Sequence, residues 1–234
     1  MTTTLIFDAF ICGLAIFAAV LEGNGAVYFF NKMPAQWLCD YGQRPSEELR
    51  NPTEQRVRSM PWKYIFTMFF LVINIKLVID DIQFSVPASF VIWILLELSI
   101  ADKKYKILPD QLIILLSVCS LGFIPYRDGV YDILLGGATG FALMVLIALI
   151  GKVTYRRDTI GGGDIKLFTA IGFICGSFGV ILIFAATAVF SATHMVYLLL
   201  RRRIKRTDYL PMAPYISIAT GVYLLFFWGM SIKI

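Results

Sequence analysis

The chain has few charged side chains, a single histidine and no closely paired cysteines. Charged residues make up 16% of its 234 residues, against about 25% in an ordinary soluble domain. A soluble protein of this size would have too few charges to cover its surface. By contrast, 58% of the residues are apolar, and the mean hydropathy is +0.74. This balance excludes disordered, collagen-like, disulfide-framework and nucleic-acid-binding classes, and it indicates an all-α, polytopic membrane protein.

The four cysteines are scattered, and no two of them form a C-x-x-C pair. Such pairs are typical of zinc sites, so we expect no metal. Cys39 lies in a polar loop. The other three cysteines lie in apolar runs, where a thiol is usually a small packing residue.

Apolar runs separated by charged or turn residues predict about eight transmembrane helices. A helix that crosses a bilayer needs about 20 mostly apolar residues. The fourth and sixth runs are short for a full crossing. The junction at Gly176-Ser177 carries no charge, so it predicts either a loop or a bend. The runs are Leu5–Phe30, Trp62–Val78, Val86–Ile100, Gln111–Phe123, Val130–Ile150, Gly162–Gly176, Phe178–Leu200 and Tyr209–Met230.

Lysine and arginine are divided unequally between the loops that join these runs. Six lie in 32–63, three in 102–110, four in 152–166 and five in 201–206, which is 18 of the 21 basic residues. Positive charge stays on the cytoplasmic side of a membrane, so these four loops are predicted to be cytoplasmic and both termini to face outward. We expect one membrane-embedded domain, residues 1–234, with a cytoplasmic loop at about 31–61.

Four carboxyls are candidates for function because an ionisable group in or beside an apolar span is costly. They are Glu22, Glu97, Asp102 and Asp164. The predicted topology puts all four toward the cytoplasmic face of the membrane.

Asp164 follows three glycines at the start of an apolar helix. Glycines allow positive φ and a close backbone approach, so a peptide or a water molecule could come near this carboxylate. The alternative is that Asp164 caps its helix. We reject a phosphate-binding loop because the Lys-Ser/Thr pair of a P-loop is missing.

Asp102 follows an apolar run and precedes three lysines within four residues. Together with Asp164 it indicates an aspartic-protease pair, in which one carboxylate acts as a base on water while the other polarises the scissile carbonyl. The alternative is a solvated acid in a turn. The sequence puts both aspartates at one membrane face, and it leaves open whether they meet.

These segments resemble a known family. Gly161-Gly162-Gly163-Asp164 with Lys166 resembles the G-x-G-D-x-K signature of the type IV prepilin leader peptidases, and Asp102 with Leu108-Pro109-Asp110 resembles their D-x5-[IL]-P-[DN] segment. Two weaker similarities lie in 23–34 and 210–214. The resemblance therefore covers nearly the whole chain in order.

The resemblance implies an eight-helix aspartic endopeptidase of the bacterial inner membrane. Such enzymes remove the basic leader from type IV prepilins, and often from pseudopilins of type II secretion, at the cytoplasmic face. Asp102 and Asp164 match the catalytic positions, and proteolysis would need no cofactor. By the same resemblance, the residues that support the site are Gly161, Gly162, Gly163, Lys166 and Pro109.

Two departures from the family pattern bear on a second activity. Many members methylate the new N-terminus with S-adenosylmethionine, and the bifunctional ones carry two C-x-x-C pairs that this chain lacks. In the segment 23–34, Val27 stands where the family has Asn, and Lys32 replaces Arg. Methyl transfer is therefore left open.

The expected substrate has a basic leader followed by a long apolar helix. Glu22 and Glu97, with Glu47 and Glu48, could attract the leader, or each Glu could instead bond a neighbouring helix. An ion-coupled transporter and a non-catalytic assembly factor of a pilus or secretion machine are the competing functions. The sequence does not say which prepilin is cut or which oligomer forms. The expected partners are the prepilin and membrane lipid, with no nucleic acid.

Overall fold

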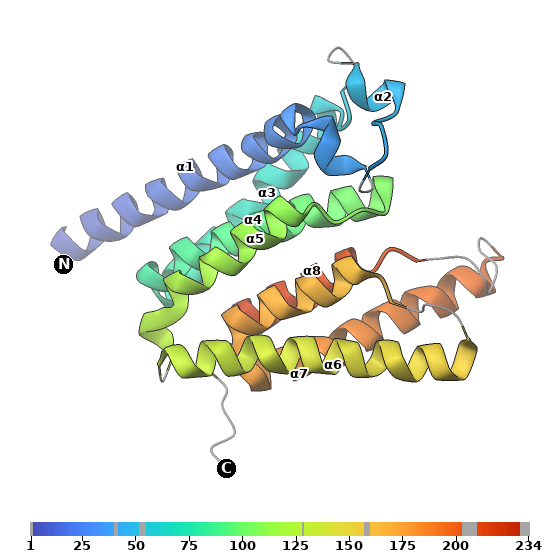
Figure 1. Cartoon of the computed structure of the whole chain (residues 1–234). Helices are drawn as coiled ribbons and strands as arrows, with labels where there is room; N and C mark the ends of the chain where they lie inside the picture. The colour runs from blue at the N-terminus through green and yellow to red at the C-terminus, as the bar shows by residue number, and fades with distance from the viewer. Residues whose placement is uncertain are drawn as a thin grey trace. The chain divides into compact units, whose positions relative to one another are not determined.

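A computed structural model shows a helical chain (Figure 1). It describes residues 2–39, 42–51, 55–127, 129–156, 160–202 and 210–229, and no strand occurs in these ranges. The chain forms two compact units, residues 1–97 and 98–234. Helix α4, Ile82–Tyr105, begins in the first unit and ends in the second. The expectation that the whole chain acts as one domain stays a prediction.

The first unit is built around the packing of α1, Thr2–Lys32, against α3, Ser59–Asp80. Their backbones approach closely at Gly23, where an added Cβ would lie 2.4 Å from the backbone nitrogen of Thr67. Small residues allow membrane helices this contact because dispersion forces and hydrogen bonds, rather than the hydrophobic effect, join them. Gly23 therefore sets the distance between the two helices.

The segment between α1 and α3 is folded back onto the end of α1. It contains η1, Ala35–Leu38, and α2, Glu47–Arg50. The guanidinium of Arg56 donates to the carbonyls of Phe30, at 3.2 Å, and of Met33. Helix ends leave carbonyls without partners inside the helix, and Arg56 satisfies two of them. Parts of the predicted loop 31–61, namely 40–41 and 52–54, lie outside the described residues.

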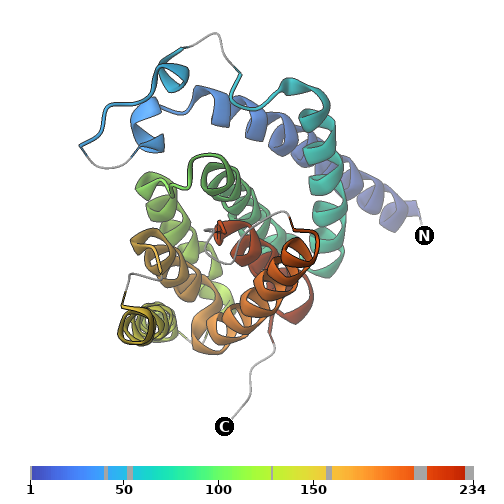
Figure 2. The same cartoon turned by 90° about the vertical axis from the view of Figure 1, so that its right-hand side faces the viewer.

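The second unit holds the rest of α4 and two close-packed long helices, α6, Val130–Tyr155, and α7, Gly162–Leu200. Figure 2 views α6 nearly along its axis. Gly136 of α6 and Gly172 of α7 face each other, and a Cβ added to either would lie 2.2 Å from the carbonyl oxygen of the other. The remaining elements are α5, Asp110–Val118, η2, Cys119–Tyr126, α8, Ala213–Val222, and η3, Tyr223–Phe227.

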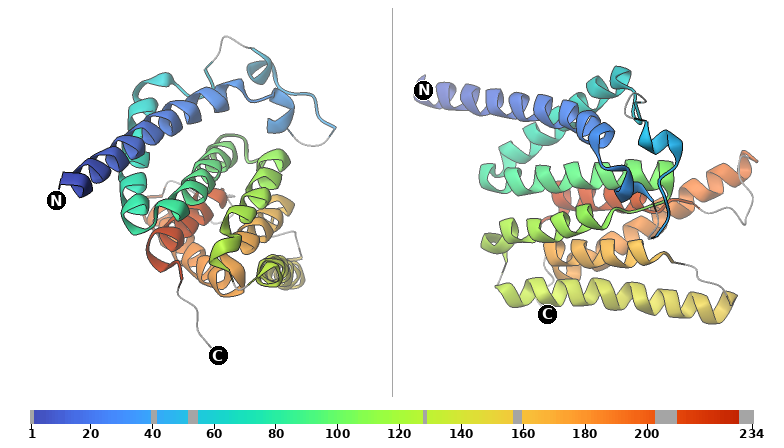
Figure 3. Two further views of the ribbon diagram at one scale, coloured as in Figure 1. Left: turned by 90° about the vertical axis from the view of Figure 1, so that its left-hand side faces the viewer. Right: turned by 45° about the horizontal axis from the view of Figure 1, so that its top comes forward.

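Helix α7 breaks at Gly176, which has φ 70° and ψ 178°. The rings of Phe168 and Phe184 lie 5.9 Å apart between centroids, although 16 residues of straight helix would separate them by about 24 Å. The chain therefore folds back on itself at Gly176, and α7 has two arms (Figure 3).

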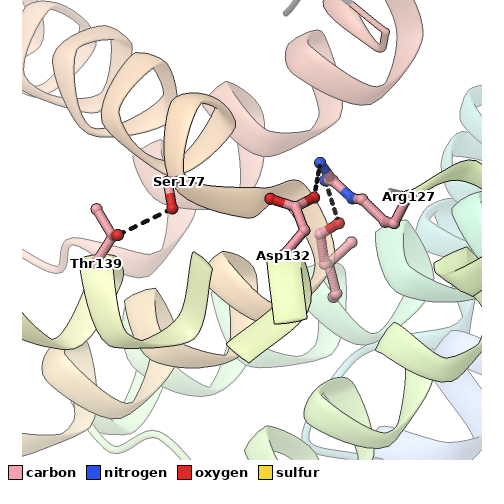
Figure 4. Close-up of polar contacts among 5 residues, drawn as sticks. Arg127, Asp132, Thr139 and Ser177 are labelled. Atoms are coloured by element: carbon pink, nitrogen blue, oxygen red, sulfur yellow. Dashed lines mark hydrogen bonds and ion pairs between the residues drawn. The ribbon is translucent and has the colours of Figure 1, made fainter. Parts of the chain in front are cut away.

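An arginine holds this break in place (Figure 4). Nη2 of Arg127 donates to the carbonyl oxygen of Ile174 at 2.6 Å, and Nη1 lies 3.3 Å from Oδ2 of Asp132. The guanidinium also stacks 4.7 Å from the ring centroid of Trp228. Arg127 thus takes up a carbonyl that the broken helix leaves without a partner inside the helix.

The helices fit the predicted membrane class. Among the described residues, five helices are long and apolar enough to cross a bilayer, and two shorter apolar helices are present. The count of about eight spans is not established and stays a prediction. The sixth and seventh predicted runs lie in one element, α7, with the bend that was expected as the alternative to a loop. The five helices are Phe10–Lys32, Ser59–Asp80, Ile82–Tyr105, Val130–Thr154 and Gly162–Leu200, and the two shorter ones are Asp110–Tyr126 and Ala213–Phe227.

Candidate active site

Asp102 lies in the last turn of α4 and is 4% exposed. Its Oδ2 accepts a hydrogen bond of 2.8 Å from the backbone N–H of Ala213, the first residue of α8. The backbone of Met212 also hydrogen-bonds to this carboxyl. The first N–H groups of a helix have no partner within it and carry partial positive charge, so the start of α8 is suited to hold a carboxylate.

Asp164 is the third residue of α7 and is 5% exposed. The backbone N–H of Gly161 hydrogen-bonds to its carboxyl, while the carbonyl of Gly161 accepts the N–H of Asp164 at 3.1 Å. The N-cap of α7 is Gly161, and Asp164 lies inside the first turn, so the alternative that Asp164 is the cap of its helix is wrong. The contact with the backbone of Gly161 orients the carboxyl of Asp164.

The three glycines before Asp164 differ from one another in role. None of them has a positive φ, and Gly161 has φ −72°, so the left-handed backbone that glycine allows is not adopted here. Gly161 is the N-cap of α7 and has extended backbone, with ψ 145°, while Gly162 and Gly163 are the first two residues of the helix. A Cβ added to Gly163 would lie 3.0 Å from the side chain of Leu108, and the approach of a peptide or a water molecule to Asp164 stays a prediction. Nothing lies within 4 Å of a Cβ added to Gly162.

The structure brings Asp102 and Asp164 into one site within the second unit. The charge on Asp102 acts electrostatically on the carboxyl of Asp164, and both side chains are almost completely buried. A like charge and burial both make it harder for a carboxyl to ionise. A pair of buried carboxyls is a chemistry suited to general acid–base catalysis, and the catalytic role of the two residues stays a prediction.

The predicted supporting residues join the starts of α5 and α7. Pro109 is the N-cap of α5, and its carbonyl accepts the N–H of Leu112 at 3.1 Å. Nζ of Lys166 lies 2.8 Å from each carboxylate oxygen of Asp110. The ion pair is partly exposed, so it ties together the two helix starts that flank the aspartates without being buried itself.

The two glutamates expected to attract the leader belong to the first unit, residues 1–97. Glu22 bonds to side chains of the helices beside it, Asn74 at 2.8 Å and Ser89 at 2.6 Å, as the alternative reading expected. Glu97 is 0% exposed, and neither of its oxygens has a partner among the described residues. The role of both in leader binding stays a prediction. The side chain of Glu48 lies outside the described residues.

Sequence reasoning missed the donor that holds Asp102. The segment 210–214 was noted only for its family resemblance, and Pro214 at the start of α8 was the available signal, because proline is favoured in the first turn of a helix. Over the described part of the chain, no three histidine, cysteine, aspartate or glutamate side chains gather in a way that could hold a metal.

Comparison with known proteins gives one family. Residues 89–196 match the model of the Type IV leader peptidase family. This region contains both aspartates, the Leu-Pro-Asp segment and the glycine run.

Curated relatives agree with this match. The "Prepilin leader peptidase/N-methyltransferase" of Bacillus subtilis (strain 168) is 32% identical over 62% of this chain and 57% of its own length. Proteins with the same name from Xanthomonas campestris pv. campestris and Aeromonas salmonicida are 32% and 27% identical, over 58% and 63% of this chain and 47% and 51% of their own lengths. The chain thus spans about half the length of the curated relatives it matches.

No solved structure matches the chain. The resemblance to the type IV prepilin leader peptidase family is nevertheless confirmed by the family model and the relatives, and residues 89–196 carry the sequence of that family.

Proposed function

We propose that this protein is an aspartic endopeptidase that removes the leader peptide of type IV prepilins. The observation that carries the proposal is the pair of buried carboxyls, Asp102 and Asp164, in one site. One carboxylate takes a proton from a water molecule, which attacks the scissile carbonyl, while the protonated partner donates a hydrogen bond to the carbonyl oxygen. The proton then passes to the leaving amine as the peptide bond breaks.

The position of the basic residues supports cleavage at the cytoplasmic face of the bacterial inner membrane. Lys103, Lys104 and Lys106 follow Asp102 directly, and positive charge near a span favours the cytoplasmic side. A prepilin would present its basic leader to this face while its apolar helix stays in lipid. The product would serve pilus assembly, or type II secretion where the substrate is a pseudopilin.

A second activity, methylation of the new N-terminus, is suggested by the names of the relatives, which include N-methyltransferase. Proteolysis by two carboxyls needs no cofactor, whereas methyl transfer would need S-adenosylmethionine. Incubating the chain with prepilin and S-adenosylmethionine carrying a labelled methyl group separates the two activities. Cleaved pilin without label would limit this chain to proteolysis.

The proposal is tested with the purified chain in lipid vesicles and a leader-bearing type IV prepilin, with the product identified by its mass. Wild type is expected to release the leader at one bond, and Asp102→Asn to release none. Asp132→Asn is the matched control, because this carboxyl of the second unit pairs with Arg127 at the α7 break and takes no part in the chemistry. Cleavage by Asp102→Asn at the wild-type rate would contradict the catalytic role of Asp102, whereas no cleavage by the wild type would contradict the peptidase proposal and favour an ion-coupled transporter.

A further inference from the structure

Three helices of the first unit each contribute one polar side chain to a single cluster. The side chains are Glu22 of α1, Asn74 of α3 and Ser89 of α4. Nδ2 of Asn74 lies 2.8 Å from Oε2 of Glu22, and Oγ of Ser89 lies 2.6 Å from Oε1 of Glu22 and 2.6 Å from Oδ1 of Asn74. The three contacts close a ring, and Asn74 and Ser89 are buried.

The count of hydrogens in this ring shows that an ionised Glu22 leaves one contact without a proton. A serine hydroxyl has one hydrogen to donate, and an amide oxygen and a carboxylate oxygen are both acceptors only. Ser89 therefore cannot donate to Glu22 and to Asn74 at the same time. The amide hydrogens of Asn74 lie on Nδ2, which already faces the other oxygen of Glu22.

We propose that Glu22 is a carboxylic acid whose proton completes this ring. Oε1–H of Glu22 donates to Oγ of Ser89, the hydroxyl of Ser89 donates to Oδ1 of Asn74, and Nδ2 of Asn74 donates to Oε2 of Glu22. Each of the three contacts then has one hydrogen, and the extra proton comes from water when the helices associate.

The ring also leaves no charge and no unsatisfied acceptor among the three side chains inside an apolar unit. An ion without a partner in such a place is costly, and so is an unpaired polar group. Nε1 of Trp93, one turn after Ser89 on α4, adds a fourth link by donating to the backbone carbonyl of Glu22 at 3.1 Å.

Glu22, Asn74 and Ser89 are therefore positioning residues. They tie α1 and α3 to the first half of α4, the helix whose last turn carries Asp102. This inference does not depend on the proposed peptidase activity, and it competes with the prediction that Glu22 attracts a basic leader by its charge.

The test compares Glu22→Gln with Glu22→Ala in lipid nanodiscs. Glutamine has the shape of the protonated acid, and its amide can donate to Ser89 while its oxygen accepts from Asn74, so we expect Glu22→Gln to unfold at the wild-type temperature. Glu22→Ala and Ser89→Ala open the ring and are expected to unfold several degrees lower. Ser85→Ala is the matched control, because Ser85 lies one turn earlier on α4, is 6% exposed like Ser89 and bonds to the carbonyl of Ile82.

Infrared spectra give a second measurement, because they report whether the carboxyl of Glu22 is protonated, which a purely structural role of Glu22 would not require. The infrared difference spectrum, wild type minus Glu22→Gln, is expected to contain the carbonyl stretching band of a protonated carboxyl. Loss of a carboxylate band instead would overturn the proposal. So would Glu22→Gln unfolding as early as Glu22→Ala, because a neutral isostere should keep the ring.

Discussion

The carboxyls of Asp102 and Asp164 are each held by backbone N–H groups at the beginning of a helix. Ala213 of α8 donates to Asp102, and Gly161 at the N-cap of α7 donates to Asp164. Backbone donors are fixed by the helices that carry them, so they orient each acid without a flexible side chain as intermediary. We expect this rigidity to keep the two acids aligned while substrate exchanges.

The ion pair between Lys166 and Asp110 gives a prediction at the same scale. Because the pair is partly exposed, its contribution to stability is small, about 0–1 kcal/mol. Lys166→Gln is expected to slow leader cleavage severalfold by loosening the starts of α5 and α7, with little change in the unfolding temperature.

Asp110→Asn should slow cleavage to a similar extent, and the double variant should be no slower than either single one, because the pair acts as a unit. The measurement is the initial rate of cleavage in membranes. If the rate of the double variant fell by the product of the two single effects, Lys166 and Asp110 would act independently.

Glycines form close backbone contacts between α6 and α7. Gly136 and Gly140 of α6 form a G-x-x-x-G stripe, and a Cβ added to Gly140 would lie 2.4 Å from the carbonyl oxygen of Phe168. Gly172 and Gly176 of α7 repeat the spacing. Stripes of this kind let membrane helices pack backbone to backbone, and here they support the arm of α7 that carries Asp164.

Gly136→Ala is expected to force α6 and α7 apart, because the added Cβ would meet the backbone of Gly172 at 2.2 Å. Overpacking of this kind lowers the free energy of unfolding by about 1–3 kcal/mol. Gly221→Ala in α8 is the control, since nothing lies within 4 Å of a Cβ added there. Chemical unfolding in detergent measures both variants, and equal stability of the two would contradict this account of the interface.

The elements were predictable from the sequence to different degrees. The runs that became α1, α3, α4 and α6 were marked by apolar length and by charges at their ends. The fold-back at Gly176 was not resolved by the same signals, because no charge divides the arms of α7. The arginine that holds it is 47 residues away from Ile174, and pattern in a single sequence does not reveal such pairs.

The site was predictable in its chemistry and not in its geometry. Asp102 and Asp164 were singled out by their positions beside apolar runs and by the family motifs that they resemble, and their catalytic role stays a prediction. The donor to Asp102 lies 111 residues along the chain, and the partners of Glu22 lie 52 and 67 residues away. Contacts at these separations depend on how the helices pack, which hydrophobic periodicity alone does not specify.

For the whole molecule, the proposed orientation makes a prediction about one thiol. Cys39 lies in the segment between α1 and α3, with its Sγ 3.3 Å from the carbonyl oxygen of Gln36, and this segment is proposed to be cytoplasmic. A membrane-impermeant maleimide should label Cys39 in inside-out vesicles and not in intact cells. Cys39→Ser should lose the label, and labelling of Cys39 from outside intact cells would reverse the proposed orientation.

The central claim is that Asp102 and Asp164 work as one catalytic pair, and the most direct measurement is the rate of leader cleavage in membranes. Wild type, Asp102→Asn, Asp164→Asn and the double variant are compared at equal protein levels. We expect each single change to lower the rate by at least about 10²–10⁴-fold, the usual contribution of a general acid or base. The double variant should be no slower, because groups that act as a unit are not additive. A single variant that cleaves near the wild-type rate would contradict the claim.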